Sequence, residues 1–299
     1  MGRFGIIGEL IPFMAKKQYS LQELDKIANE IRQDIIRMLL EAGSGHSAGP
    51  LGMADVFTAL YFAVMNHDPK NPDWEERDRL ILSNGHICPV RYAAMARAGY
   101  FPLEELKTLR KFGSRLQGHP ERKKLPGVET TSGPLGSGLS QAAGMAYVAK
   151  YIDKKNWRVF CAMSDGEQEA GQTWEAAMFA GKNKLNNLTG IIDRNNIQID
   201  GYVEDIMPLE PLRAKYEAFN WNVIEIDGHN IEEIIDACSQ AKATQEKPTC
   251  IIAHTIPGKG VSFMENKFEW HGKPPKPEEA KTALRELRAI GVKITGIRE

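Results

Sequence analysis

"VFCAMSDGEQEAGQTWEAAMFAGKNKLNNLTGIIDRNNIQIDG", residues 159–201, is the stretch that decides the fold class of this 299-residue chain. It contains two short, bounded apolar runs, Val159–Met163 and Leu188–Ile192, which are typical of buried strands. Between them, residues Ala170–Lys184 show helical spacing, with lysines near the end. Strand, helix and strand in this order predict a βαβ unit with parallel strands and a right-handed crossover. The helix face predicted to be buried carries Trp174, Ala177, Met178 and Gly181.

Polar residues follow each of these two strands. Asp165 comes after the first strand and Asn195 after the second, so both are expected at the carboxyl edge of the sheet, where open α/β folds bind ligands. A carboxylate, an amide oxygen and backbone carbonyls are hard ligands that suit Mg²⁺ or Ca²⁺. These ligands would fill only part of the metal's coordination shell, and phosphate oxygens and water usually complete it. Beside a helix N-terminus, the pattern therefore indicates a metal that holds a phosphorylated ligand. The alternative is that Asp165 caps a turn and Asn195-Asn196 forms a hairpin loop.

Composition places the chain among ordinary globular proteins. It is 42% hydrophobic with a formal net charge of −1, which supports a large core and gives no support for nucleic-acid or membrane-surface binding. The N-terminus lacks a signal-peptide pattern, and no apolar run approaches the ~18 residues of a membrane span. We therefore expect a cytoplasmic protein whose cysteines, without paired metal spacing, are buried free thiols. The cysteines are Cys88, Cys161, Cys238 and Cys250.

Strands and helices alternate along the rest of the chain, which predicts a single α/β domain in three layers, α/β/α, with a mainly parallel sheet. Residues 1–19 are expected to form an N-terminal arm, and residues 20–299 the domain. Ser20 and Glu23 form a predicted capping box. The other expected elements are helices Leu21–Ala42, Leu51–Met65, from Pro89, from Ile231 and Pro277–Ile290, and strands Leu80–Ser83, Asn222–Ile226 and Thr249–His254.

Four of the seven histidines have glycine or proline neighbours in predicted loops: His46, His86, His119 and His271. Loops at the carboxyl edge can converge on the metal site, and imidazole can bind hydroxyl-rich substrates and move protons near neutral pH. A glycine-rich turn at 133–138 precedes a helix and would let a phosphate approach backbone amides. We expect structural or surface roles for His67 and His254, and rank His229, at another strand end, below the four.

Several segments resemble one enzyme family. The aspartate after a strand, the glutamate two residues later, and the asparagine 30 positions on (195 − 165) resemble the thiamine-diphosphate-binding motif. "SGHSAGPLGMAD", "LSNGHICPV", "GHPE", "TSGPLGSGLSQAAGMA" and "EWHGKPP" resemble transketolase segments in the family's order, from about residue 20 onward. The resemblance implies a thiamine-diphosphate-binding fold, with thiamine diphosphate and Mg²⁺ (or Ca²⁺) as cofactors.

The resemblance also implies roles for single residues. Asp165, Asn195 and the carbonyl of Ile197 would ligate the metal. The residues implied to contact the coenzyme are Gly166 and His86 at the diphosphate, Gly133 and Leu135 along its length, and Ile256 against the thiazolium ring. The residues implied to face the reacting carbon, bind donor hydroxyls and move protons are His46, His119 and His271, of which His271 also nears the diphosphate.

The implied activity is transfer of a two-carbon ketol unit from a ketose phosphate to an aldose phosphate. Full-length family members carry a second domain, which holds the aminopyrimidine ring and a glutamate that protonates it. This chain ends at Glu299 before any such domain. We therefore expect a split transketolase, in which a separate C-terminal subunit supplies the pyrimidine-binding domain in an α2β2 heterotetramer, and in which this chain is inactive alone.

Two positions depart from the family pattern. Ser164 stands where a glycine often precedes the aspartate, and Ala170 stands where a glutamate usually links the two active sites of the dimer. Glu169 is adjacent but turned by about 100° on a helix, so coupling between sites would be lost or rewired. Two alternatives stay open. One is a deoxyxylulose-phosphate synthase or 2-oxo acid dehydrogenase E1 component, against which the GHPE segment and the histidines argue. The other is a non-catalytic cofactor-binding subunit.

Overall fold

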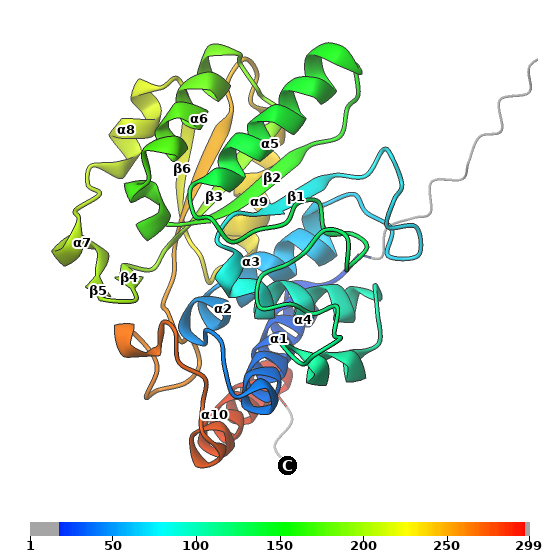
Figure 1. The fold of residues 1–299 in the computed structure, drawn as a ribbon, viewed down its shortest axis with the longest axis vertical. Coiled ribbons are helices and arrows are strands. Elements are labelled where there is room, and N and C mark those ends of the chain that lie inside the picture. Colours follow the sequence, from blue (N-terminus) through cyan, green and yellow to red (C-terminus); the bar gives the residue numbers. More distant parts are fainter. Residues whose placement is uncertain (1–17, 297–299) are drawn as a thin grey trace, which may run out of the picture.

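The computed structural model describes residues 18–296, and its centre is one sheet of five parallel strands. The spatial order is β1-β2-β3-β7-β6 (Figure 1). Parallel pairing of the second and third strands confirms the predicted βαβ unit, since Ser164 lies opposite Asp193 at their carboxyl ends. The strands are β1 Arg79–Leu82, β2 Val159–Ser164, β3 Leu188–Arg194, β6 Asn222–Asp227 and β7 Thr249–His254.

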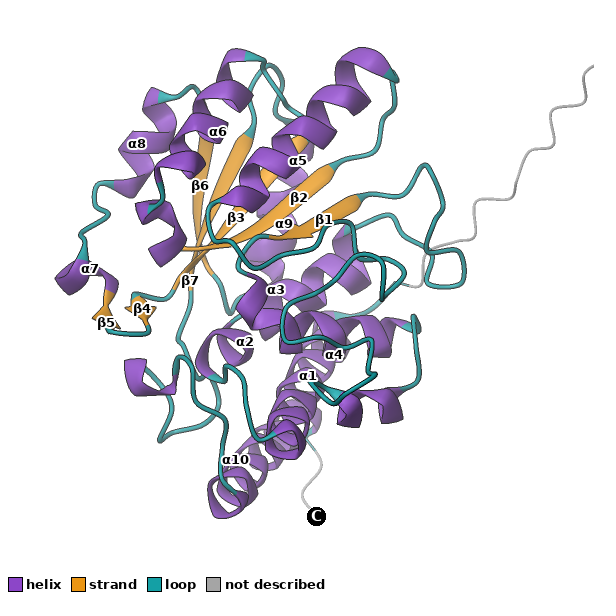
Figure 2. Cartoon of the chain, in the orientation of Figure 1, coloured by secondary structure: helices purple, strands orange, loops and turns teal. Residues whose placement is uncertain are grey.

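Helices cover both faces of the sheet, so the predicted three-layer arrangement is confirmed (Figure 2). Successive residues of a strand point to opposite faces. Phe160 and Ala162 of β2 therefore join one hydrophobic core, and Cys161 and Met163 join the other. The first core includes residues of α1 Leu21–Ala42, α3 Ala54–Ala59, α4 Cys88–Ala98, α9 Ile231–Ala243 and α10 Pro277–Thr295. The second includes residues of α5 Ser137–Tyr147, α6 Gly171–Lys182 and α8 Leu212–Ala218.

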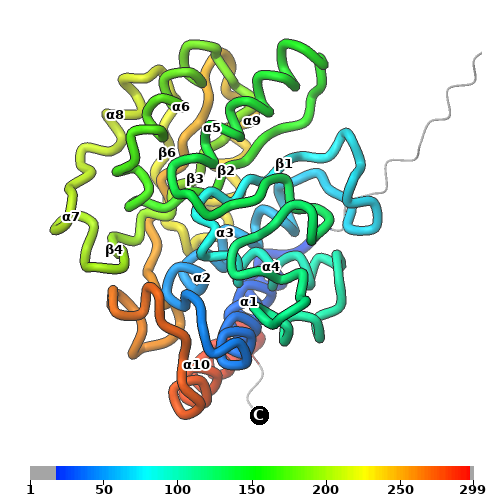
Figure 3. The backbone as a smooth tube through the Cα atoms, viewed as in Figure 1, coloured from blue at the N-terminus to red at the C-terminus, as the bar shows by residue number. Residues whose placement is uncertain are grey.

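The first and last long helices pack side by side and antiparallel (Figure 3). The Gln22 amide donates to the carbonyl of Ile294 (2.7 Å), and the Asn29 amide donates to the carbonyl of Leu287 (3.0 Å). The predicted capping box is confirmed, because the Ser20 backbone N–H donates to the Glu23 carboxylate (2.8 Å) and the Ser20 hydroxyl accepts from the Glu23 backbone N–H (3.3 Å). Residues 1–17 of the predicted arm lie outside the described residues.

Two details of the predicted helices are wrong. The helix expected over Leu51–Met65 is divided into α2 Ala48–Gly52, α3 and a π turn over Leu60–Val64. On α6, Met178 is 53% exposed, whereas the buried residues are Thr173, Ala176, Ala177, Ala180 and Gly181. The buried face of α6 carries only small side chains, because the backbone near Phe219 packs closely against it. A Cβ at Gly181 would lie 1.8 Å from the Phe219 carbonyl oxygen.

Shorter elements complete the fold. A hairpin of β4 Ile197–Gln198 and β5 Gly201–Tyr202 follows the third strand of the large sheet and leads into α7 Val203–Ile206. The remaining turns are 3-10 helices Gly85–Ile87, Leu103–Thr108, Gly166–Glu169 and Phe268–Trp270, and a π turn Val148–Ile152. All four cysteines are buried and free, as predicted. Within residues 18–296, no helix has the length and apolarity needed to cross a membrane.

Candidate active site

The tips of β2 and β3 lie together, as the sequence predicts. Asp165 is fully buried, and its Oδ2 accepts a hydrogen bond from the backbone N–H of Asn196 (2.5 Å). The Asn195 side chain is held by two hydrogen bonds: its Nδ2 donates to Asp193 Oδ2 (2.8 Å), and its Oδ1 accepts from the backbone N–H of Ile197 (3.0 Å). The alternative also has a basis in the structure, since Asp165 Oδ1 accepts from the Gly166 N–H (2.8 Å) at the start of a 3-10 turn. One carboxylate thus shapes the turn and still faces the second strand tip.

Two buried carboxyl groups, Asp165 and Asp193, lie at these tips. Burial raises the pKa of Asp165, and burial together with the neighbouring charge of Asp165 raises the pKa of Asp193 to about 7. A cation already lies against this charge, because Arg194 Nη1 is 3.1 Å from Asp165 Oδ2. No group of three or more His, Cys, Asp or Glu side chains able to hold a metal occurs between residues 18 and 296. The predicted ligand set has one carboxylate and otherwise amide and carbonyl oxygens, so it would not form such a group.

Three of the predicted histidines converge in one cluster. Ring centroids are 4.9 Å apart for His46 and His86, 5.1 Å for His86 and His271, and 5.4 Å for His46 and His271. Burial lowers the pKa of His46 to about 4, lowers the pKa of His86 well below its usual value, and lowers the pKa of His271. The three rings are therefore uncharged at neutral pH, and each can donate one hydrogen bond and accept another.

The fourth predicted histidine lies at the edge of this cluster. His119 is exposed, and a Cβ added at Gly85 would lie 3.2 Å from His119 Cδ2, which places the ring next to the loop that carries His86. Burial, with a smaller effect of the Arg110 charge, lowers the pKa of His119. All four histidines from glycine- and proline-flanked loops are thus in one region.

The loops that carry His46 and His271 are tied together by hydrogen bonds. The Ser47 hydroxyl donates to the carbonyl of Lys273 (2.6 Å), and the Gly258 N–H donates to the carbonyl of Ala48 (2.8 Å). The Lys273 ammonium lies 3.9 Å from the centroid of the Trp270 ring, a cation–π contact that fixes the second loop next to His271. These contacts join segments more than 200 residues apart, since 273 − 47 is 226.

Buried polar atoms without a partner in the described part of the chain surround this cluster. They are His46 Nδ1, both amide atoms of Asn84, and Ser132 Oγ. Asn84 is fully buried, and a Cβ at Gly85 would lie 2.2 Å from Ser132 Oγ, so Ser132 adjoins the segment of Asn84 and His86. Buried polar groups are almost always hydrogen-bonded in folded proteins. These atoms therefore fit a polar ligand bound beside the histidines, and the sequence patterns did not predict Asn84 or Ser132.

The other predicted coenzyme contacts lie on neighbouring segments. Gly133 and Leu135 belong to the turn before α5, where Leu135 is 45% exposed, and Gly166 follows the tip of β2. Ile256 follows β7, and its backbone N–H donates to His229 Nε2 (2.7 Å). One part of the prediction fails here. The amides of Gly136 and Gly138 are bonded to protein oxygens and are not available to a phosphate.

His229 has a structural role that the sequence pattern did not predict. Because its Nε2 accepts from Ile256, the proton sits on Nδ1, which lies 2.8 Å from Asp55 Oδ2 and donates to it. Asp55 is in turn paired with Arg32, and both are buried. This chain of contacts fixes the segment that carries Ile256. The sequence signal that could have indicated this role is the position of His229 directly after Asp227-Gly228, at the end of a strand. His67, by contrast, is structural, with ring nitrogens 2.7 Å from the Tyr61 carbonyl and 3.0 Å from the Tyr100 hydroxyl.

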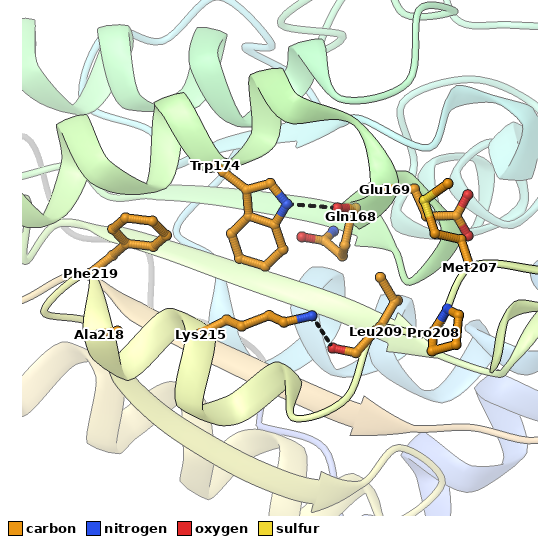
Figure 4. Close-up of a pocket in the computed structure, with 9 residues that line it drawn as sticks. All are labelled: Gln168, Glu169, Trp174, Met207, Pro208, Leu209, Lys215, Ala218 and Phe219. Atoms are coloured by element: carbon orange, nitrogen blue, oxygen red, sulfur yellow. Dashed lines mark hydrogen bonds between the residues drawn. The ribbon is translucent and has the colours of Figure 1, made fainter.

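A separate hollow of about 450 Å³ lies between α6 and α8, and Figure 4 shows the side chains around it. The Trp174 indole N–H donates to the carbonyl of Gln168 (2.9 Å), and the Lys215 ammonium donates to the carbonyl of Leu209 (2.6 Å). The indole donor is therefore in use, and one of the three N–H groups of the ammonium is in use. The lining residues, none of them a predicted site residue, are Gln168, Glu169, Trp174, Met207, Pro208, Leu209, Lys215, Ala218 and Phe219.

Comparison with known proteins identifies the family. The family model described as "Transketolase, thiamine diphosphate binding domain" matches residues 24–292. A relative from Clostridium sp. strain MSTE9, named 6-deoxy-6-sulfo-D-fructose transketolase subunit SqwG, is 45% identical, and the match covers 93% of this chain and 100% of the relative. A relative from Phocaeicola vulgatus, named as one subunit of an apulose-4-phosphate transketolase, is 40% identical, with 89% of this chain and 94% of the relative covered.

Undivided enzymes match over part of their length. Transketolase of Rattus norvegicus is 40% identical, and the match covers 90% of this chain and 43% of that protein. The crystal structure of transketolase from Campylobacter jejuni superposes with a TM-score of 0.84 at 35% identity, over 92% of this chain and 46% of that one. This chain therefore belongs to the transketolase family, in which it corresponds to the N-terminal, thiamine-diphosphate-binding subunit of a split enzyme.

Proposed function

We propose that this chain is the coenzyme-binding subunit of a magnesium-dependent transketolase, which transfers a two-carbon ketol unit from a ketose phosphate to an aldose phosphate. Family membership supports the reaction class. The observation that carries the proposal is the convergence of His46, His86 and His271, whose rings are uncharged at neutral pH. Such rings bind sugar hydroxyls and move protons without a permanent charge.

Thiamine diphosphate, when bound, supplies the carbanion chemistry that breaks and forms the carbon–carbon bond next to a carbonyl. The chain's own residues would bind and orient the coenzyme and the sugar substrate. His46, His119 and His271 would hold the donor hydroxyls and exchange protons at the substrate oxygens, and His86 and Gly166 would contact the diphosphate. The unpartnered amide of Asn84 and hydroxyl of Ser132 support this reading, because a ligand there would supply the hydrogen bonds that the protein does not.

A divalent metal, Mg²⁺ or Ca²⁺, is part of the proposal. Asp165, the Asn195 amide oxygen and the Ile197 carbonyl would hold it, an all-oxygen set that suits these ions. The fixed orientation of the Asn195 amide supports this set, because Asp193 takes its nitrogen and leaves its oxygen on the side of Ile197. Asp165 is the one carboxylate of this set, and it lies fully buried at the tip of β2.

A separate C-terminal subunit, in an α2β2 heterotetramer, completes the proposed enzyme. Two relatives whose names call them transketolase subunits are covered over 94–100% of their length, whereas undivided transketolases are covered over 43%. A cytoplasmic location belongs to the same proposal, because all four cysteines are buried free thiols, as in reducing compartments.

The test is a ketol-transfer assay on the purified chain, with and without a candidate C-terminal subunit. Three donors are compared: xylulose 5-phosphate, the sulfonated ketose in the name of the Clostridium relative, and pyruvate. We expect transfer from a ketose donor only in the mixture, and none with Asp165→Ala. A pyruvate-specific reaction would assign the chain to another thiamine enzyme class, and normal transfer by the chain alone would refute the split-subunit part. Absence of any reaction in a stable mixture would favour the non-catalytic alternative.

A further inference from the structure

Glu167 is a buried carboxylate in the described chain that the proposed chemistry does not use. It is 1% exposed and forms no ion pair with any described residue, although burial of an unpaired carboxylate is costly. Its oxygens instead accept from three donors. Oε1 accepts from the hydroxyl of Ser83 and from the backbone N–H of Gly136 (2.7 Å), and Oε2 accepts from the backbone N–H of Ser164 (3.1 Å).

These three donors belong to three different segments. Ser83 directly follows β1, Ser164 ends β2, and Gly136 is the cap residue of α5. The Ser83 hydroxyl also accepts from the N–H of Gly138 (3.0 Å), so the carboxylate and the hydroxyl together satisfy two N–H groups at the start of α5. The segments are in close contact, because a Cβ at Gly138 would lie 2.3 Å from the Ser83 side chain.

Each of the three segments leads directly to a residue with a proposed coenzyme or metal contact. The β1 segment continues to His86, the β2 segment continues to Asp165, and the turn before α5 carries Gly133 and Leu135. We propose that Glu167 is a positioning residue, which fixes these three segments relative to one another and so presets the coenzyme site. This inference rests on the proposed function of the chain.

A carboxylate suits this position better than an amide. All three groups that point at Glu167 are donors, and an ionised carboxylate only accepts. In Glu167→Gln, the amide NH₂ would face at least one N–H or O–H donor. The segments would then separate, or one donor would lose its partner. The predicted result is a less well-formed coenzyme site, in which the chemical groups proposed to react are all still present.

The test uses the full chain in complex with its C-terminal partner, at saturating Mg²⁺. Thiamine diphosphate is titrated by calorimetry, and kcat is measured at saturating coenzyme. For Glu167→Gln, we expect the Kd of the coenzyme to rise about tenfold, equivalent to about 1.4 kcal/mol. We expect kcat at saturation to stay within about twofold, a separation that a general loss of folded protein would not give. Glu175→Gln is the control, since Glu175 is exposed on α6 and its side chain forms no hydrogen bond with any described residue.

Ser83→Ala keeps the inference testable if Glu167→Gln does not fold. It removes the hydroxyl that connects the carboxylate to Gly138, and the Kd should rise several-fold. In the double variant, the increase should not exceed that of the more affected single variant by more than about twofold, because both residues act through one set of contacts. Folded Glu167→Gln and Ser83→Ala proteins with wild-type Kd, or with lowered kcat and wild-type Kd, would overturn the inference. A wild-type complex that does not bind thiamine diphosphate would refute the proposed function instead.

Discussion

Replacing His46 should change how stability depends on pH. Burial lowers the pKa of His46 from 6.5 to about 4. As the pH falls below 6.5, the unfolded chain therefore takes up a proton at this position that the folded chain accepts only near pH 4. The stabilising contribution of the neutral ring is fully present above pH 6.5 and is lost progressively as the pH falls toward 4. A variant with no titratable group at position 46 should lack this loss.

The expected size follows from the two pKa values. At pH 7.5 both states are almost fully deprotonated, so the contribution to the pH dependence is close to zero. At pH 5.0 the unfolded ring is mostly protonated and the folded ring mostly neutral, which corresponds to about 2 kcal/mol at 1.36 kcal/mol per pH unit.

The assay is urea unfolding of wild type and His46→Gln at pH 7.5 and pH 5.0. Between these values, wild type should lose about 2 kcal/mol more of its unfolding free energy than the variant does. His46→Phe is the matched control, because its packing differs from that of Gln but it also has no proton to bind. Both variants should therefore show the same pH dependence, whatever their stability at pH 7.5. If wild type and both variants lose stability in parallel, the inference that folded His46 stays neutral at pH 5.0 is wrong.

Three further predictions follow from the site and the core. Asp165→Ala should abolish magnesium-dependent binding of thiamine diphosphate in a calorimetric titration, and chelation of the metal from wild type should have the same effect. Gly181→Ala should destabilise the fold by about 3 kcal/mol or more in urea unfolding, because its Cβ would lie 1.8 Å from a carbonyl oxygen. Gly144→Ala is its control, since a Cβ there meets nothing within 4 Å, and it should stabilise the helix by up to about 1 kcal/mol. Arg32→Met should cost about 3–5 kcal/mol in the same assay, because it leaves the buried Asp55 carboxylate without its guanidinium partner.

The sheet and the strand tips could be predicted because their signals are local. A short apolar run followed by Asp165-Gly166 predicts a strand that ends at a turn, and the βαβ rule then places Asn195 beside Asp165. For the histidine cluster, the sequence predicted only that the four loops carrying these histidines could meet. The burial that keeps the three central rings neutral comes from tertiary packing, which a single sequence does not reveal.

The parts that sequence patterns missed depend on contacts between distant segments. A lone Glu167 after Asp165-Gly166 gives no sign that its partners are Ser83 and Gly136. The break between α2 and α3 also lies at a contact between distant segments. Gly52 lies against the backbone at position 256, where a Cβ would be 3.1 Å from the Ile256 carbonyl oxygen. Helical spacing places Met178 on the buried face of α6, but only small side chains fit there, and Met178 is exposed.

The ties between the His46 and His271 loops have a consequence for biosynthesis. The first of these histidines emerges from the ribosome early, and the second only after more than nine-tenths of the 299 residues have been translated. The hydrogen bonds of Ser47 and Ala48 to the later loop cannot form before then. A nascent chain can therefore contain β1, β2 and β3 while the loop that completes the histidine cluster has not yet been synthesised.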